Sequence, residues 1–449
     1  IKGLFAYPGV KPVINREGLC EIFGLGPAKS YGKGVFKDIY EVLPGHFLEY
    51  DREGLKDRAY WELKAKEHTD SEKDTIEHTR WLVKDAVEMQ MLSDIPISTF
   101  LSGGVDSSLV TAICAKKLQK EGKNLNTFSF DFVNNHKYFK SNAFQPSEDR
   151  PWVDKMVDHA KTDHRYLECD NENMIENLYK AVDARDLPCM ADVESSMLYF
   201  CSKVVKYNKV TGECADEIFG GYPWFHKEEC FKAEIFPWSM DMQPRKMLLN
   251  DDIIQKVDLE SYARTAYQKT INETPKLYGE DRIEARRRQI SYLNLRWFMV
   301  TLMDRMDRTS MHCGLEARVP FADHRIVEYL YNVPWELKCL NGVVKGLLRA
   351  AGEGILPDEV LYRRKSPYPK TYDPNYEKIL SKELLKVMAK KGAPIKELID
   401  AYKLSRFLDS PKDYGKPWYG QLMAGPQMIA YLLQVNYWLG KYQITLDLS

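Results

Sequence analysis

Residues 100–108 constrain the fold of this chain more than any other segment. They read Phe-Leu-Ser-Gly-Gly-Val-Asp-Ser-Ser, with the apolar run 95–101 leading into them and the helix-like segment 107–120 following. This order predicts a strand, a glycine turn and a helix. The N–H groups of such a turn and the positive end of the helix dipole form a pocket for an anion. We therefore expect a phosphate-binding loop in an α/β fold.

The side chains of this loop suit a bound phosphate. Gly103 and Gly104 let the backbone approach an anion with no Cβ in the way. Further hydroxyl donors come from Ser102, Ser107 and Ser108. No Gly-Lys-Ser/Thr follows, so the loop is not a Walker A motif. Asp106 lies inside the loop, and a carboxylate beside a phosphate is explained if it holds Mg²⁺.

Two motifs carry a resemblance to a known family. The run Ser-Gly-Gly-Val-Asp-Ser-Ser resembles the pyrophosphate loop of the ATP pyrophosphatases, which cleave ATP between its α and β phosphates and adenylate a substrate. Residues 211–222, Thr-Gly-Glu-Cys-Ala-Asp-Glu-Ile-Phe-Gly-Gly-Tyr, resemble the second nucleotide-binding motif of asparagine synthetases. The resemblance implies that Thr211 and Gly212 bind the nucleotide and that Asp106 and Asp216 share one Mg²⁺. Many relatives carry Gly where this chain has Cys214.

A third motif lies at residues 315–325. It is similar to the Glu-x-Arg-Val-Pro-Phe signature of the same family. Glu316 and Arg318 flank one small residue before an apolar run, which favours a buried structural ion pair. Asp304, in the charged segment just upstream, is predicted to be catalytic.

The remaining site residues also follow from the resemblance. Lys345 opens a Lys-x-x-Leu-Arg segment, which implies a lysine over the reacting α-phosphate, where its compact charge suits the transition state. Lys365 would hold the departing pyrophosphate. Leu101 and the backbone at Phe130 would frame the adenine. Two interpretations stay open for Glu213. In the first it has a function in the site, either orienting substrate or accepting a proton from ammonia. In the second it is a plain carboxylate at the start of a helix.

Bulk composition excludes several classes of function. The 449 residues suggest two or three domains. The net charge of −1 disfavours nucleic acid or a membrane as a main partner. Nine cysteines without a Cys-x-x-Cys pair favour reduced thiols in a cytoplasm. No run of 18 apolar residues is present, so we expect no transmembrane helix.

The pattern of the whole chain predicts its architecture. Alternating strands and helices imply an α/β fold, a parallel twisted sheet with helices on both faces, of the adenine nucleotide alpha hydrolase-like type. A helix with an apolar face is expected over residues 76–91, and a helical C-terminal part from residue 263 onward. Residues 134–150 fit either an ordered loop or a lid.

Residues 1–62 predict a β-rich segment, with a hairpin around Pro44 and Gly45. They resemble the end of the Ntn-type glutamine amidotransferase domain that opens glutamine-dependent asparagine synthetases. Because the chain begins at Ile1 and Cys20 is internal, we expect a truncated remnant that does not hydrolyse glutamine. A linker over 63–74 and a synthetase domain over 75–449 complete the expected organisation.

The predicted reaction is the ATP-dependent amidation of aspartate through a β-aspartyl-AMP intermediate. The cofactors are ATP and Mg²⁺, the small-molecule partners are aspartate and ammonia or glutamine, and the resemblance implies a cytoplasmic homodimer. Three alternatives remain. They are another amide-forming ligase of this fold (a β-lactam synthetase or peptide cyclase), a thiolating or tRNA-modifying ATP pyrophosphatase, and a catalytically silent interaction platform.

Overall fold

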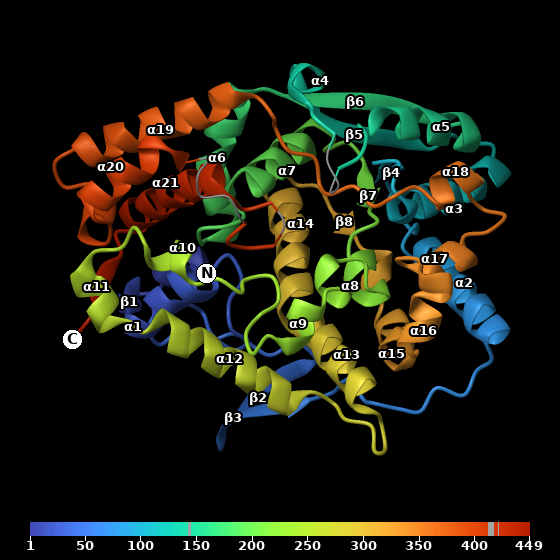
Figure 1. Cartoon of the computed structure of the whole chain (residues 1–449), viewed down its shortest axis with the longest axis horizontal. Helices are drawn as coiled ribbons and strands as arrows, with labels where there is room; N and C mark the ends of the chain where they lie inside the picture. Colours follow the sequence, from blue (N-terminus) through green and yellow to red (C-terminus); the bar gives the residue numbers. More distant parts are fainter. Residues whose placement is uncertain (142–144, 412–416, 421) are drawn as a thin grey trace.

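Five parallel strands form the central sheet of the computed structural model, which describes residues 1–141, 145–411, 417–420 and 422–449 (Figure 1). The strand order is β6-β5-β4-β7-β8. The strands are β4 (Ile97–Phe100), β5 (Asn126–Phe132), β6 (Asp163–Cys169), β7 (Asn208–Val210) and β8 (Ala317–Arg318). The first three residues of β4 are buried whichever way they point, as expected for a strand covered on both faces.

Two groups of helices supply that cover. One group packs around α3 and consists of α2 (Glu72–Met89), α3 (Val105–Lys120), α5 (Arg150–Ala160), α17 (Gly346–Ala351) and α18 (Asp358–Leu361). The other packs around α7 and consists of α6 (Asn171–Arg185), α7 (Ala191–Lys203) and α14 (Val300–His312). The two groups lie on either side of the strands in Figure 1. The predicted parallel sheet with helices on both faces is confirmed.

The helix expected over 76–91 is α2, and its buried side chains recur at helical spacing. Leu82, Val83, Ala86 and Val87 are buried, and Ser71 caps the first turn by accepting a hydrogen bond from the Asp74 N–H. The charged segment before it is extended and is held by α15 (His324–Asn332) through hydrogen bonds to Asn332.

The chain beyond β7 is mainly helical, and this includes the part from residue 263 onward that was predicted to be helical. Its other helical elements are α8 (Ala215–Phe219), η3 (Pro223–Phe225), α9 (Glu228–Lys232), α10 (Gln243–Lys246), α11 (Asp251–Lys256), α12 (Leu259–Glu273), α13 (Arg282–Leu293), η4 (Asn294–Met299), η5 (Pro320–Ala322), α16 (Trp335–Lys338), η6 (Leu340–Gly342), α19 (Pro374–Ala389), η7 (Pro394–Glu397), α20 (Ala401–Asp409) and α21 (Gly425–Lys441). Within 134–150 the chain forms α4 (Asn135–Tyr138), while residues 142–144 lie outside the described part.

Residues 1–62 differ from the β-rich expectation. They form η1 (Lys2–Ala6), β1 (Val13–Asn15), α1 (Arg16–Leu19), η2 (Cys20–Leu25), β2 (His46–Asp51) and β3 (Gly54–Ala59). The first 25 residues are therefore mainly helical. They do not form an isolated layer, because β1 pairs in parallel with the C-terminal strand β9 (Thr445–Asp447).

The hairpin is present, but its turn is not the predicted one. β2 and β3 pair across residues 51–54, whereas Pro44 and Gly45 precede β2. The Asp51 side chain accepts a hydrogen bond from the Glu53 N–H, and Gly54 has φ +113°. An Asx turn followed by a glycine in a conformation that other residues avoid thus reverses the chain.

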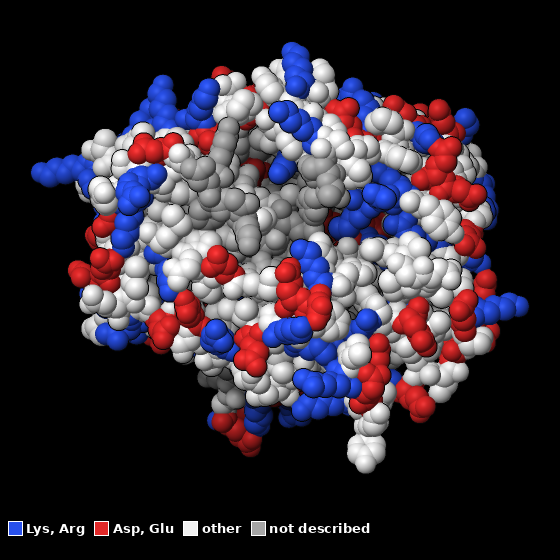
Figure 2. All heavy atoms as spheres, viewed as in Figure 1, with Lys and Arg blue, Asp and Glu red and all other residues white. Residues whose placement is uncertain are grey.

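Three further observations concern the chain as a whole. Among the described residues, none of the helices is both long and apolar enough to cross a bilayer. Positive and negative side chains are interspersed over the described part of the face in Figure 2, in keeping with the net charge of −1. All nine cysteines are unpaired thiols.

Candidate active site

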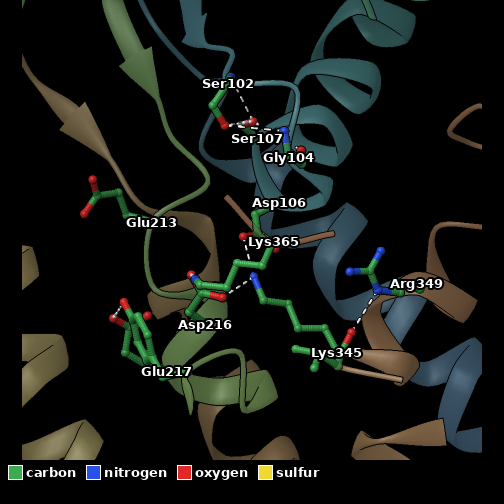
Figure 3. Close-up of polar contacts among 12 residues, drawn as sticks. Ser102, Gly104, Asp106, Ser107, Glu213, Asp216, Glu217, Lys345, Arg349 and Lys365 are labelled. Atoms are coloured by element: carbon green, nitrogen blue, oxygen red, sulfur yellow. Dashed lines mark hydrogen bonds and ion pairs between the residues drawn. The ribbon is translucent and has the colours of Figure 1, made fainter. Parts of the chain in front are cut away.

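A pocket of about 470 Å³ opens where β4, β5 and β7 end. Parallel sheets bind ligands at this edge because the loops after neighbouring strands converge there. The lining includes the phosphate loop, the 211–217 segment, part of α14 and residues 365–369. Segments that lie far apart in the sequence therefore meet in one cavity (Figure 3).

The phosphate loop is closed by its own serines. The Ser102 N–H donates to Ser107 Oγ at 3.1 Å, and the two hydroxyl oxygens are 2.9 Å apart. Gly103 has φ +68°, and a Cβ there would lie 2.6 Å from Trp152 Cβ. The loop thus requires glycine at this position. It ends at Gly104, immediately before α3, so that the helix N-terminus faces the pocket.

Two lysines and two aspartates form a charged cluster, of which Asp106, Asp216 and Lys365 line the pocket. Lys345 Nζ lies 2.5 Å from Asp106 Oδ2 and also contacts Asp216 Oδ1. Lys365 Nζ pairs with Asp216 Oδ2. The Lys345 side chain is only 3% exposed. The ammonium of Lys345 therefore bridges the carboxylates of the two sequence motifs (Figure 3).

Burial and pairing act in opposite directions on these groups. Burial raises the pKa of Asp106 and outweighs the attraction of Lys345. Burial would also raise the pKa of Asp216, but Lys345 and Lys365 hold it well below its ordinary value. Burial alone would lower the pKa of Lys345, yet the two carboxylates raise it. The lysine is accordingly a charged group held inside the protein.

Three backbone positions show how closely the two motifs meet. A Cβ on Gly212 would lie 2.7 Å from the Ser107 N and 2.8 Å from the Asp106 carbonyl carbon. A Cβ on Gly221 would overlap Asp216 Oδ1 and Lys345 Cε. Cys214, just before α8, has φ +73°, a conformation that favours glycine.

Lys345 is also held in an unusual backbone conformation. It precedes α17 with φ +58°, and such strain in a non-glycine residue persists only where the surroundings enforce it. Arg349, in the same motif, donates to the carbonyl groups of Val344, Leu361 and Arg363 instead of facing the pocket. Its role is to hold the chain around Lys345.

Glu213 lines the pocket as predicted, but it has a partner that the sequence did not indicate. Both of its carboxylate oxygens lie 2.7 Å from one guanidinium nitrogen of Arg305. Asp304, which precedes Arg305 on α14, is not brought to this site. Its carboxylate lies 3.7 Å from Arg185, since adjacent helical residues point in different directions. The structure thus does not support the predicted catalytic role of Asp304.

The other predicted nucleotide contacts divide into two groups. Leu101, Ser102, Phe130 and Thr211 line the pocket. Ser108 is fully buried and is absent from the lining of the described pocket, so its contact with the nucleotide stays a prediction. The predicted burial of the Glu316–Arg318 pair is wrong. The two form an ion pair at 2.9 Å, but the Glu316 side chain is 56% exposed.

Besides Arg305, two further described residues of the site went unrecognised in the sequence. Glu217 lines the pocket and accepts a hydrogen bond from the Tyr222 hydroxyl at 2.8 Å. Arg363 donates to the Ser102 carbonyl at 2.9 Å and pairs with Asp149, which ties the 363–369 segment to the phosphate loop. Glu217 was detectable as a second carboxylate beside Asp216, whereas nothing in the sequence pairs Arg363 with the loop.

The donor set suits a magnesium ion bound together with phosphates. Asp106 Oδ1 is buried and has no hydrogen-bond partner among the described residues. Among the residues that the structure describes, no group of three or more His, Cys, Asp or Glu side chains could hold a metal ion. Mg²⁺ usually takes one or two carboxylates and fills its remaining sites with phosphate oxygens and water, so Asp106 and Asp216 are sufficient.

Comparison with known proteins yields one consistent family. The family model described as asparagine synthase matches residues 78–440. Asparagine synthetase [glutamine-hydrolyzing] 3 of Bacillus subtilis (strain 168) is 47% identical, over 100% of this chain and 73% of that protein. Asparagine synthetase [glutamine-hydrolyzing] 1 of the same organism is 27% identical over 74% of this chain and 55% of its own length. The Homo sapiens asparagine synthetase is 27% identical over 64% of this chain and 42% of its own length.

Proposed function

The chain belongs to the asparagine synthase family, and from this premise we propose that it uses ATP to amidate aspartate, with release of AMP and pyrophosphate. The observation that carries the proposal is the Lys345 ammonium between Asp106 and Asp216. It puts a buried positive charge where the two nucleotide motifs meet. A reaction that brings an anionic carboxylate to an anionic phosphate needs such a charge.

The first step joins aspartate to the α-phosphate. The phosphates lie over the serine-lined loop and the N-terminus of α3, and Mg²⁺ held by Asp106 and Asp216 would neutralise their charge. The β-carboxylate of aspartate attacks the α-phosphorus, and the bond to pyrophosphate breaks. Lys345 stabilises the negative charge that grows on the α-phosphate, and Lys365 binds the leaving pyrophosphate. The lysines, which bind carboxylates in the free enzyme, exchange these partners for phosphate oxygens.

The second step forms the amide. Ammonia attacks the acyl carbon of β-aspartyl-AMP, AMP leaves with the bonding electrons, and the nitrogen loses a proton. We propose that Glu213 orients the substrate in this step. Its carboxylate lines the pocket and is held in place by hydrogen bonds from Arg305 to both of its oxygens.

We assign the synthetase activity to residues 75–449 and the 1–62 segment to the end of an amidotransferase domain. Cys20, the one thiol in that segment, is 5% exposed, and burial raises its pKa to about 12. It is therefore a poor nucleophile near neutral pH. A cytoplasmic homodimer is the proposed state, in line with the family resemblance and the unpaired thiols, and light scattering of the purified chain tests the dimer.

The decisive experiment measures AMP, pyrophosphate and asparagine with ATP, Mg²⁺ and aspartate, with ammonia or glutamine as the nitrogen source. We expect asparagine from ammonia and none from glutamine in this chain. Lys345→Gln should lower the rate by at least about 100-fold, as for other residues that stabilise developing charge, while Lys382→Gln, an exposed lysine of α19, should not.

Two other outcomes would each indicate a different function. Pyrophosphate release with a different carboxylate, but not with aspartate, would identify another amide-forming ligase. A folded protein that binds no nucleotide and turns over no carboxylate would be an interaction platform.

A further inference from the structure

Among the described residues, Arg305 is a buried cation of the pocket that the reaction described above leaves unused. Three Lys or Arg side chains line the cavity among the described residues: Arg150, Arg305 and Lys365. Lys365 pairs with Asp216. Arg150 lies over the Tyr166 ring, pairs with Glu168, and has a side chain 48% exposed at the outer side. Arg305 is only 5% exposed.

The guanidinium of Arg305 is only partly bonded. One of its terminal nitrogens donates to both oxygens of Glu213. Its Nε is buried and has no hydrogen-bond partner in the described chain. A guanidinium has five N–H donors in a planar fork, and a buried donor without a partner carries a free-energy cost. The unbonded part of Arg305 is therefore suited to an anionic ligand.

The surroundings of Arg305 make this a site for a small charged group. Leu302 and Met306, its neighbours on α14, line the same cavity, and the Tyr368 ring lies 5.3 Å from the guanidinium carbon. Hydrogen bonds of a charged pair are strong in such apolar surroundings. Burial would lower the pKa of Arg305, but Glu213 raises it, so the side chain stays charged.

We propose that Arg305 binds the α-carboxylate of the substrate aspartate and thereby makes the site select an amino acid with two carboxylates. The inference rests on the proposed function. Aspartate must direct its β-carboxylate at the α-phosphate, beside Asp106 and Asp216. Its second carboxylate would be repelled by those groups unless a cation receives it elsewhere in the cavity. Arg305 receives it, and Glu213 faces the α-ammonium group, so the zwitterion meets a pair of opposite charges.

The test compares aspartate with β-alanine, which keeps the reacting carboxylate and the amino group but lacks the α-carboxylate. In the native chain, AMP formation should show a kcat/KM for aspartate at least about 100-fold above that for β-alanine, as expected when a buried donor is left unpaired. Arg305→Gln should reduce that ratio to below about 10-fold, because only aspartate loses a partner for its α-carboxylate. Arg308→Gln, on the same helix with a side chain 53% exposed, should keep the native ratio.

The possible results distinguish a failure of the proposed function from a failure of the assignment of Arg305. An inactive native chain that binds ATP would contradict the proposed function and not the assignment of Arg305. An active native chain whose Arg305→Gln form keeps full discrimination would overturn the assignment. If that variant does not fold, binding of aspartate and β-alanine to the native chain with a non-hydrolysable ATP analogue replaces it. Equal affinities would then contradict the inference.

Discussion

Glu217 is a buried carboxylate of the site whose pKa lies above its ordinary value. It is 2% exposed, follows Asp216 directly, and accepts a hydrogen bond from Tyr222. Burial, helped by the negative charge of Asp216, raises the pKa of Glu217 to about 7. The side chain is therefore partly protonated near neutral pH.

This residue should make stability depend on pH. The folded chain keeps the proton of Glu217 up to about pH 7, while the unfolded chain loses it near 4.5. The contribution of protonated Glu217 to the free energy of unfolding is fully present below pH 4.5 and is lost as the pH rises through 7. Relative to Glu217→Gln, the native chain should lose about 3 kcal/mol of unfolding free energy between pH 4.5 and 8.

Urea denaturation at pH 5, 6, 7 and 8 measures this difference. Glu53→Gln serves as the control, because that side chain is 78% exposed. Parallel pH profiles for the native chain and Glu217→Gln would show that Glu217 ionises normally.

Two residues of the site occupy left-handed backbone conformations at helix starts, Cys214 before α8 and Lys345 before α17. Each costs roughly 1 kcal/mol or more relative to glycine. At Lys345 a glycine would lose the ammonium that bridges the two aspartates, which explains why the strain is retained. Nothing in the structure explains a similar need for the thiol of Cys214.

At the scale of elements, the site depends on the contact between the 211–214 loop and the first turn of α3. Thr211 continues the sheet beyond β7 by donating its N–H to the Arg318 carbonyl. The loop then passes against the backbone of Asp106 and Ser107. This contact sets the separation of Asp106 and Asp216, because each aspartate belongs to one of the two elements.

Gly212→Ala should separate these elements. The added Cβ would meet backbone atoms of α3, which cannot turn aside as a side chain would. We expect kcat/KM for ATP to fall by at least about 100-fold, while overpacking costs only about 1–3 kcal/mol of stability. Initial rates at varied ATP, with thermal unfolding of the same samples, measure both quantities.

Gly440→Ala is the matched control, since its Cβ would lie 3.8 Å from Pro394 Cγ, an ordinary contact. Native-like ATP kinetics in Gly212→Ala would mean that the two loops tolerate a wider separation.

At the scale of the whole molecule, both ends of the chain share one core. Ile14, in β1, is fully buried and belongs to the same apolar cluster as Trp438 of α21. Phe36 lies 5.4 Å from Trp438 between ring centres, and Lys37 pairs with Asp447 at 2.8 Å. Residues 1–37 therefore cannot unfold without exposing part of the C-terminal helical core.

Ile14→Ala should accordingly destabilise the molecule as one unit, by about 2–5 kcal/mol, the usual cost of truncating a buried isoleucine. Calorimetry should show a single transition at lower temperature. Leu48→Ala, in the exposed hairpin at 44% exposure, should change stability little. A separate early transition in Ile14→Ala would show instead that the N-terminal segment folds as an independent domain.

The sequence alone determined the parallel α/β fold, the phosphate loop and the positions of Asp106, Asp216 and Lys345 in motifs. The fold and the loop follow from glycine turns, helix starts and apolar periodicity, which are local properties of the chain, and the motif positions of the three residues follow from the family resemblance. Only the tertiary structure decided that Lys345 bridges the two aspartates, that Arg305 and not Asp304 faces the pocket, and that residues 1–37 join the C-terminal core. These features depend on which distant segments meet and on which way a helix is rotated, and neighbouring residues in the sequence do not specify either.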